Sequence, residues 1–248
     1  MIIPIRNEKE IEKMRRAGKA LVEVFKTVGP LVAPGITTLE LNAEIEKKIR
    51  DLGATAPCKG YHGYPAAACI SIDDVVVHGI PSLRRLAEGE IVSVDIVLKL
   101  DGYNADATRT YAVGRISAEK QRLIDVTRRC FYNGVAKIKA GAHLGDAQHA
   151  IQMTAELAGY GVVRAMTGHG IGREMHEEPT IENYGRAGSG PLLKSGMCLA
   201  IEPMIAMGDW DVTIDADGWT CRTVDGLPAA HYENTVLVTE TGCEILTE

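Results

Sequence analysis

Two β-rich runs flank the dipeptide Asp101-Gly102, and this segment constrains the fold more than any other in the chain. Asp-Gly favours a two-residue type I′ hairpin turn, because both turn positions need a positive φ. A hairpin with this loop pairs Asp95 with Thr108. Side chains alternate between the two faces of a strand, so Asp106 points to the same side as Thr108. The sequence therefore predicts that Asp95 and Asp106 are diagonal neighbours on one face of an antiparallel sheet.

Apolar residues at steps of three and four predict two pairs of helices. The first pair covers residues 8–28 and the segment from Thr37 to Gly53, where Thr37-x-x-Glu40 forms a capping box. The second pair begins after Ser117 and again near residue 145, and it ends at Gly159.

The two helix pairs share a spacing of 106 residues, the difference between Gly141 and Gly35 and between Gly159 and Gly53. Phe131 and Phe25 have the same separation. These identities are few, and chance is the alternative explanation. We interpret them as an internal duplication.

Strand-like segments rich in Ile, Val and Thr occupy residues 68–78, 90–100, 103–113, 197–206 and 231–239. No linker divides residues 1–248, and no Gly-x-Gly-x-x-Gly follows a strand as in dinucleotide-binding folds. The chain is therefore predicted to be one α+β domain. Two related halves of two helices each would pack on a curved, largely antiparallel sheet.

Composition excludes several other classes of protein. A formal net charge of −6 argues against nucleic acid or an anionic membrane as the main partner. The six cysteines have no Cys-x-x-Cys spacing, which argues against structural zinc sites and favours reduced thiols. Since there is neither a signal peptide nor an apolar run of about 18 residues, we expect a cytoplasmic protein.

Carboxylates in unusually apolar surroundings indicate a metal centre. Asp95 lies inside Ile-Val-Ser-Val-Asp-Ile-Val, Glu202 ends an apolar strand before a proline, and Glu233 begins another strand. His169 lies between glycines that would let the backbone approach a ligand and adopt positive φ. Each residue alone has an ordinary alternative, such as a capping Asp or a loop histidine. Together with Asp106 they predict a site neutralised by cations, because buried like charges are costly.

Four carboxylates and one imidazole suit Mn, Fe, Co or Zn, and they are more than one ion needs. We therefore expect two divalent ions that share a hydroxide nucleophile. His78 and His176 lie in segments of similar character and could donate hydrogen bonds during the reaction. The other histidines are expected to be surface or structural residues: His62, His143, His149 and His231.

Six segments in order closely resemble the type I (bacterial-type) methionine aminopeptidase family of pita-bread metallopeptidases, over nearly the whole chain. They are Tyr61-His-Gly-Tyr-Pro, Val77-His-Gly-Ile-Pro, Val94-Asp with Ala105-Asp-Ala-Thr-Arg-Thr, Thr167-Gly-His-Gly-Ile-Gly-Arg-Glu-Met-His-Glu-Glu-Pro, Ile201-Glu-Pro-Met and Tyr232-Glu-Asn-Thr. The resemblance implies a pita-bread fold and removal of the initiator methionine from nascent chains with a small second residue.

In that family Asp106 and Glu233 would bridge two metal ions. Asp95 would complete the shell of one ion, and His169 and Glu202 that of the other. The shared hydroxide would attack the scissile carbonyl, with Glu202 as the proton carrier.

The remaining roles also follow from the resemblance. His176 would steady the tetrahedral oxyanion, and His78 would contact the scissile amide nitrogen. The methionine side chain would enter an apolar slot lined by Tyr61, His62, Tyr64, Cys69 and Trp219. The expected partner is a nascent polypeptide N-terminus at the ribosome, and nothing in the pattern requires more than a monomer.

The chain departs from the family pattern at Ala105, Met175, His231 and Asn234. These departures leave the expected ligands in place and bear on substrate preference and activity level. Two other functions compete. An Xaa-Pro dipeptidase or aminopeptidase of the same fold usually carries an extra N-terminal domain, and a non-catalytic binding protein on this scaffold typically loses metal ligands.

Overall fold

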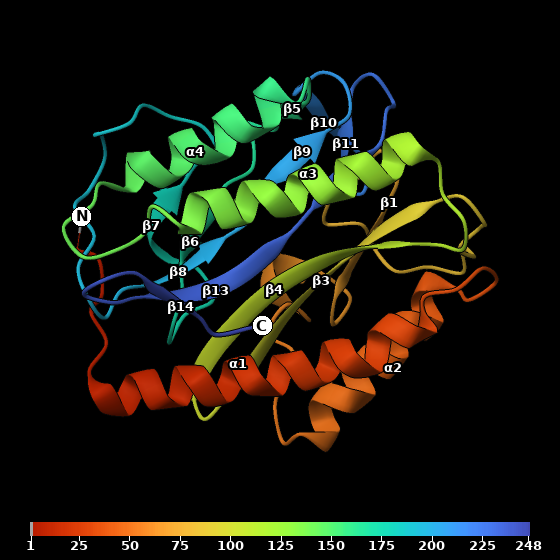
Figure 1. The fold of residues 1–248 in the computed structure, drawn as a ribbon. Helices are drawn as coiled ribbons and strands as arrows, with labels where there is room; N and C mark the ends of the chain where they lie inside the picture. The colour runs from red at the N-terminus through yellow and green to blue at the C-terminus, as the bar shows by residue number, and fades with distance from the viewer. Residues whose placement is uncertain (1) are drawn as a thin grey trace.

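The computed structural model describes residues 2–248 and contains four α-helices and two short 3-10 helices within them. The α-helices are α1 (Glu8–Val28), α2 (Thr38–Asp51), α3 (Ala118–Val135) and α4 (Leu144–Leu157), and the 3-10 helices are η1 (Gly29–Leu31) and η2 (Tyr61–Gly63). The helix pairs α1/α2 and α3/α4 are therefore the two pairs predicted from the sequence. In Figure 1 the strands β3, β4 and β13 run between these pairs.

The strands form one large sheet and two small ones. Their bounds are β1 (Cys69–Ile72), β2 (Val75–Val77), β3 (Ile91–Leu100), β4 (Tyr103–Ala112), β5 (Gly161–Val162), β6 (Gly168–Gly170), β7 (Glu177–Ile181), β8 (Cys198–Ile201), β9 (Met204–Ala206), β10 (Val212–Ile214), β11 (Cys221–Thr223), β12 (Ala229–His231), β13 (Glu233–Val238) and β14 (Cys243–Ile245). The large sheet has the order β1-β3-β4-β13-β8-β6-β7, with β14 also on β13. Its pairings are antiparallel, as predicted.

The predicted hairpin is confirmed in turn and in register. Asp101 and Gly102 have φ of 51° and 83°, the positive values that a type I′ turn needs. Asp95 pairs with Thr108, and Val97 pairs with Asp106. The two aspartates therefore lie on one face of the sheet, one pleat apart.

Side-chain caps begin the predicted helices. Thr37 and Glu40 form the expected capping box of α2, in which Thr37 Oγ1 accepts from the Glu40 backbone N–H at 3.1 Å. Ser117 caps α3 by accepting from the Lys120 backbone N–H at 3.2 Å. Such caps satisfy backbone donors that the first helical turn leaves without partners.

The second helix of each pair repeats at the predicted spacing. The bounds of α2 and α4 differ by 106 residues at both ends, since 144 − 38 and 157 − 51 give the same number. Gly53 and Gly159 follow these helices with φ of 71° and 85°. The shared geometry supports the interpretation of an internal duplication.

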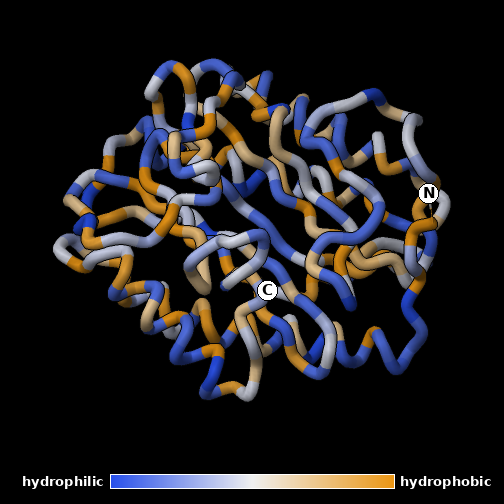
Figure 2. Tube along the Cα trace, turned by 180° about the vertical axis from the view of Figure 1, so that it is seen from behind, coloured by the Kyte–Doolittle hydropathy of each residue, from blue (hydrophilic) through white to orange (hydrophobic). Residues whose placement is uncertain are grey.

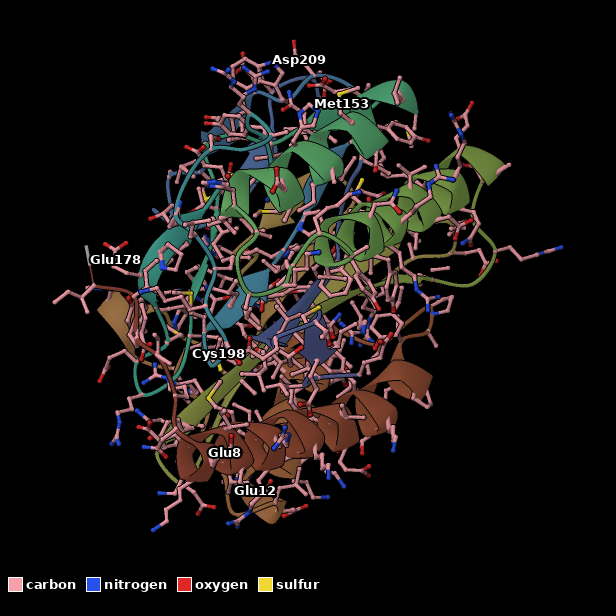
Figure 3. The ribbon with its side chains drawn as sticks, turned by 60° about the vertical axis from the view of Figure 1, so that its left-hand side comes forward. Glu8, Glu12, Met153, Glu178, Cys198 and Asp209 are labelled. Atoms are coloured by element: carbon pink, nitrogen blue, oxygen red, sulfur yellow. The ribbon has the colours of Figure 1, made fainter. Side chains whose placement is uncertain are left out.

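Each helix pair covers its own region of apolar core. Leu21, Val24 and Ile45 pack against the β3–β4 side of the sheet, whereas Phe131 and Ile151 pack against its β8–β13 side. Hydrophilic and hydrophobic segments alternate along the helical turns at the lower edge of Figure 2, as one-sided burial requires. Figure 3 shows Glu8 and Glu12 on the outer side of α1 and Cys198 inside the molecule.

Several strands were not predicted, or not with these bounds. The segment 68–78 is two strands in different sheets, because the chain turns at Asp73, where φ is 47°. The segment 197–206 is likewise divided between β8 and β9 by Pro203. The strands β6 and β7 contain glycines, charges and a proline without a two-residue alternation, so the sequence pattern missed them.

The cysteines are free, as expected. Within residues 2–248, no helix combines the length and apolar character needed to cross a membrane.

Candidate metal and active site

A cavity of about 610 Å³ opens at the face of the sheet that carries the two aspartates. All of the site residues predicted from the sequence line it: Tyr61, His62, Tyr64, Cys69, His78, Asp95, Asp106, His169, His176, Glu202, Trp219 and Glu233. They come from segments that span most of the chain, so tertiary folding brings them together.

The hairpin and strand β13 place three of the carboxylates. Thr108 pairs with Asp95 on one side and with Glu233 on the other. Its hydroxyl donates a hydrogen bond to Glu233 Oε2 at 2.8 Å. Asp106 is 4% exposed and Glu233 is 1% exposed, so neither carboxylate is well solvated.

Strands β6 and β8 place His169 and Glu202. His169 pairs with Ala200, two residues before Glu202. His169 Nδ1 lies 2.9 Å from the Gly170 carbonyl oxygen. Because a carbonyl can only accept, Nδ1 carries the hydrogen and Nε2 keeps a free lone pair. Nε2 lies 3.5 Å from Glu202 Oε1 and 3.7 Å from Asp106 Oδ2.

The prediction that the glycines beside His169 adopt a positive φ is wrong. Neither Gly168 nor Gly170 has a positive φ. A Cβ at Gly168 would collide with the Ala200 carbonyl, and a Cβ at Gly170 would collide with the Glu178 carbonyl. The glycines therefore allow β6 to pack closely between its neighbouring strands.

Burial and mutual repulsion disfavour the charged forms of these groups. Burial raises the pKa of Asp95 to about 6. Burial, and then the negative charge of Glu233, raises the pKa of Asp106 well above its usual range. The pKa of Glu202 rises for the same two reasons. Burial lowers the pKa of His169 to about 4, so its imidazole is neutral.

The donor set fits divalent cations. Among residues 2–248, two groups each bring one ligand atom per residue within 4.8 Å of the others: Asp106, His169 and Glu233, and Glu202, His231 and Glu233. Asp106 Oδ1 and Glu233 Oε1 are buried without a hydrogen-bond partner among the described residues. A cation would satisfy both oxygens and neutralise the carboxylates that burial otherwise penalises.

Aromatic and sulfur-containing side chains form the other wall of the cavity. The ring of Trp219 contacts Tyr64 edge-on, with centroids 5.1 Å apart, and its centroid lies 6.1 Å from that of His78. Cys69 is buried beside Tyr64. Such a wall suits a flexible apolar side chain.

His176 contacts both Tyr61 and His169. Its Nδ1 is 2.9 Å from the Tyr61 hydroxyl, and its ring packs edge-on against His169 with centroids 4.4 Å apart. When the Tyr61 hydroxyl donates to Nδ1, Nε2 carries the hydrogen and can donate to a ligand.

Comparison with known proteins now identifies the family. A model described as metallopeptidase family M24 matches residues 12–240. The chain belongs to metallopeptidase family M24. It is 49% identical over 247 residues to the methionine aminopeptidase of Clostridium acetobutylicum, and the match covers 99% of each chain.

Solved structures agree with this M24 assignment. The methionine aminopeptidase of Rickettsia prowazekii superposes with a TM-score of 0.98 and 42% identity, covering 100% of both chains. A prolidase of Pyrococcus furiosus matches with a TM-score of 0.81 and 25% identity, and only 65% of that chain is covered. The fold is therefore the pita-bread fold expected from the sequence.

Sequence reasoning missed three residues at the site of this M24 metallopeptidase. His231, expected to be a surface or structural residue, is 2% exposed and lines the cavity. Cys58 and Met175 also line it, with their sulfur atoms 4.0 Å apart. In the sequence, Met175 and His231 stand out only as departures from the family pattern. For His231 a second signal is its position two residues before Glu233.

Proposed function

We propose that this chain removes the N-terminal methionine from nascent proteins and peptides whose second residue is small. One observation carries the proposal: the carboxylates and His169 line the same cavity as the wall of Tyr64, Trp219 and Cys69. A centre able to hydrolyse an amide thus lies beside a slot for a thioether. The names of the relatives support the same activity.

We propose two divalent ions at this centre, chosen from Co, Mn, Fe and Zn. Asp106 and Glu233 would bridge them, Asp95 would complete one shell, and His169 and Glu202 would complete the other. The two ligand groups that share Glu233 support a pair. When bound, such ions lower the pKa of water enough for it to attack an amide at neutral pH.

The protein's own side chains would transfer the proton, stabilise the developing charge and bind the substrate. Glu202 would hold the proton taken from water and pass it to the leaving amine. His176 Nε2 would donate to the carbonyl oxygen of the substrate as negative charge develops there, with Tyr61 fixing the ring. His78 would contact the scissile amide nitrogen, and Tyr61, His62, Tyr64, Cys69 and Trp219 would line the methionine slot.

We also propose that residues 1–248 act as one catalytic domain, as a monomer, on chains emerging from the ribosome. Analytical ultracentrifugation would test the monomeric state, and co-sedimentation with ribosomes would test binding to the ribosome.

The activity test uses three substrates: peptides that begin Met-Ala, Met-Gly and Ala-Pro. The protein is assayed after chelator treatment and again after addition of Mn, Co or Fe. We expect metal-dependent release of methionine from the first two peptides and no cleavage of the third. Cleavage of Ala-Pro alone would indicate an Xaa-Pro peptidase, and no cleavage of any peptide would indicate a binding protein.

A further inference from the structure

His231 is a buried imidazole that the proposed reaction does not use. It ends strand β12 and is 2% exposed. Within residues 2–248, neither Nδ1 nor Nε2 has a hydrogen-bond partner. A neutral imidazole carries one donor and one acceptor, and such groups rarely stay unpaired when buried. The side chain lines the main cavity, so a ligand in that cavity can reach it.

The backbone fixes the position of this imidazole. The His231 N–H donates to Thr110 Oγ1 at 3.0 Å, and its carbonyl oxygen accepts from the same hydroxyl at 2.8 Å. His231 also pairs with Met204 across β12 and β9. These contacts fix the main chain of His231, and so the point from which its side chain enters the cavity.

Each of the two carboxylate oxygens of Glu202 faces the Nε2 atom of a different histidine. His169 Nε2 is 3.5 Å from Glu202 Oε1, and His231 Nε2 is 3.6 Å from Glu202 Oε2. These separations are longer than good hydrogen bonds. Two ligand atoms each about 2.1 Å from one ion at a tetrahedral angle lie about 3.4 Å apart, so both distances suit pairs of metal ligands.

We propose that His231 is an additional metal ligand, which coordinates through Nε2 beside Glu202 and Glu233. The inference rests on the metal centre of the proposed function and adds a second imidazole to its ligands. His231, Glu202 and Glu233 bring their ligand atoms within 4.8 Å of one another, as His169, Asp106 and Glu233 do. Because nitrogen donors favour borderline ions over hard ones, the second imidazole biases the centre toward Co, Zn or Fe and against Mg.

The test compares His231→Gln with the unchanged protein. His149→Gln is the matched control, because it makes the same substitution at a histidine of α4. The Nδ1 atom of His149 contacts the Gly185 carbonyl. All three proteins are stripped with chelator and titrated with Co²⁺ by calorimetry. X-ray absorption of the loaded proteins then counts the imidazoles around cobalt, and thermal unfolding checks that each variant is folded.

We expect His231→Gln to weaken Co²⁺ binding at one of the two sites by at least about 10-fold, the lower limit for losing even an outer-shell partner of a metal ligand. The imidazole count should fall from about two to about one per pair of ions, and His149→Gln should match the unchanged protein. If His231→Gln fails to fold, the unchanged protein still decides, because a count of about one imidazole per pair would refute the assignment. Unchanged affinity and count in a folded His231→Gln would also refute it.

Failure of the inference and failure of the proposed function give different results. If His231 is not a ligand, the unchanged protein still binds Co²⁺ and cleaves Met-Ala. If the proposed function is wrong, the unchanged protein releases no methionine from Met-Ala under any metal condition.

Discussion

Replacing Asp106 by Asn should have opposite effects on stability with and without metal. The Asp106 carboxylate is buried beside Glu233 and Asp95, and one of its oxygens has no hydrogen-bond partner in the part of the chain that the structure describes. Without a cation, ionised carboxylates at this site repel one another. With cations bound, the same carboxylates are the proposed ligands, and loss of Asp106, one of the two proposed bridging residues, should remove both binding and turnover.

The structure sets the size of the effect. The ligand atoms of Asp106 and Glu233 lie within 4.8 Å of each other. Two unit charges at that distance repel by about 3 kcal/mol at an effective dielectric constant of about 20. An Asn removes this repulsion but introduces amide donors, which cost about 1–3 kcal/mol if they find no partner. We expect the metal-free variant to be more stable above the carboxylate pKa values by up to about 3 kcal/mol.

The pH dependence has a definite sign. The folded-state pKa values of Asp95, Asp106, Glu202 and Glu233 are raised above their ordinary values. Their contribution to stability is therefore fully present below the ordinary pKa values and is lost as pH rises through the folded ones. For Asp95 this window runs from its ordinary pKa of 3.8 to its raised pKa of about 6. The other three carboxylates extend the loss to higher pH.

The assay is thermal unfolding of metal-free protein at pH 5 and pH 8. At pH 8 the variant should unfold up to about 6–12 °C above the unchanged protein, and at pH 5 the difference should shrink. With Co²⁺ at about 100 times its dissociation constant, the unchanged protein should gain about 2.7 kcal/mol and the variant little. Asp51→Asn, an exposed change, is the control. A metal-free variant less stable at pH 8, or one with near-normal turnover, would refute the reasoning.

Three further predictions concern other parts of the structure. His176→Ala should lower kcat on Met-Ala by about 100-fold with little change in KM, because it removes a hydrogen-bond donor to the oxyanion. Steady-state kinetics measure both constants, and a change confined to KM would count against that role. Gly170→Ala should lower the melting temperature, because the added Cβ would collide with the Glu178 carbonyl. The control Gly242→Ala adds a Cβ into open space and should leave the melting temperature unchanged. Equal melting temperatures for the two variants would contradict the close packing of β6. Phe131→Ala should reduce the free energy of unfolding by about 3–5 kcal/mol in a urea titration, because the ring is 0% exposed in the core. A loss below about 1 kcal/mol would show that neighbouring side chains fill the space that the ring leaves.

Much of the architecture could be read from local patterns. The Asp101-Gly102 turn and the two-residue alternation fixed the register that sets Asp95 and Asp106 on one face. The Thr37 capping box marked the start of α2 correctly. These features depend on contacts between residues near in sequence, which a pattern of residue types can specify.

The sequence missed β6 because its glycines reflect close packing against other strands, and it missed β7 because the charges and proline of that strand show no two-residue alternation. Gly170 must be small since the Glu178 carbonyl lies against it, and no local pattern shows that contact. The resemblance to a known family, and not periodicity, supplied the roles expected of His78 and Trp219.

The sequence alone determined the hairpin, the helix pairs and which carboxylates sit in apolar strands, because turns, caps and alternation are local. Only the tertiary structure decided what surrounds Glu202. Strand β13 pairs with both β4 and β8, and β12 pairs with β9, so segments more than 100 residues apart along the chain meet at one cavity. His231 shows the consequence: its neighbours in sequence gave it no evident role, and long-range pairing placed it 3.6 Å from a carboxylate.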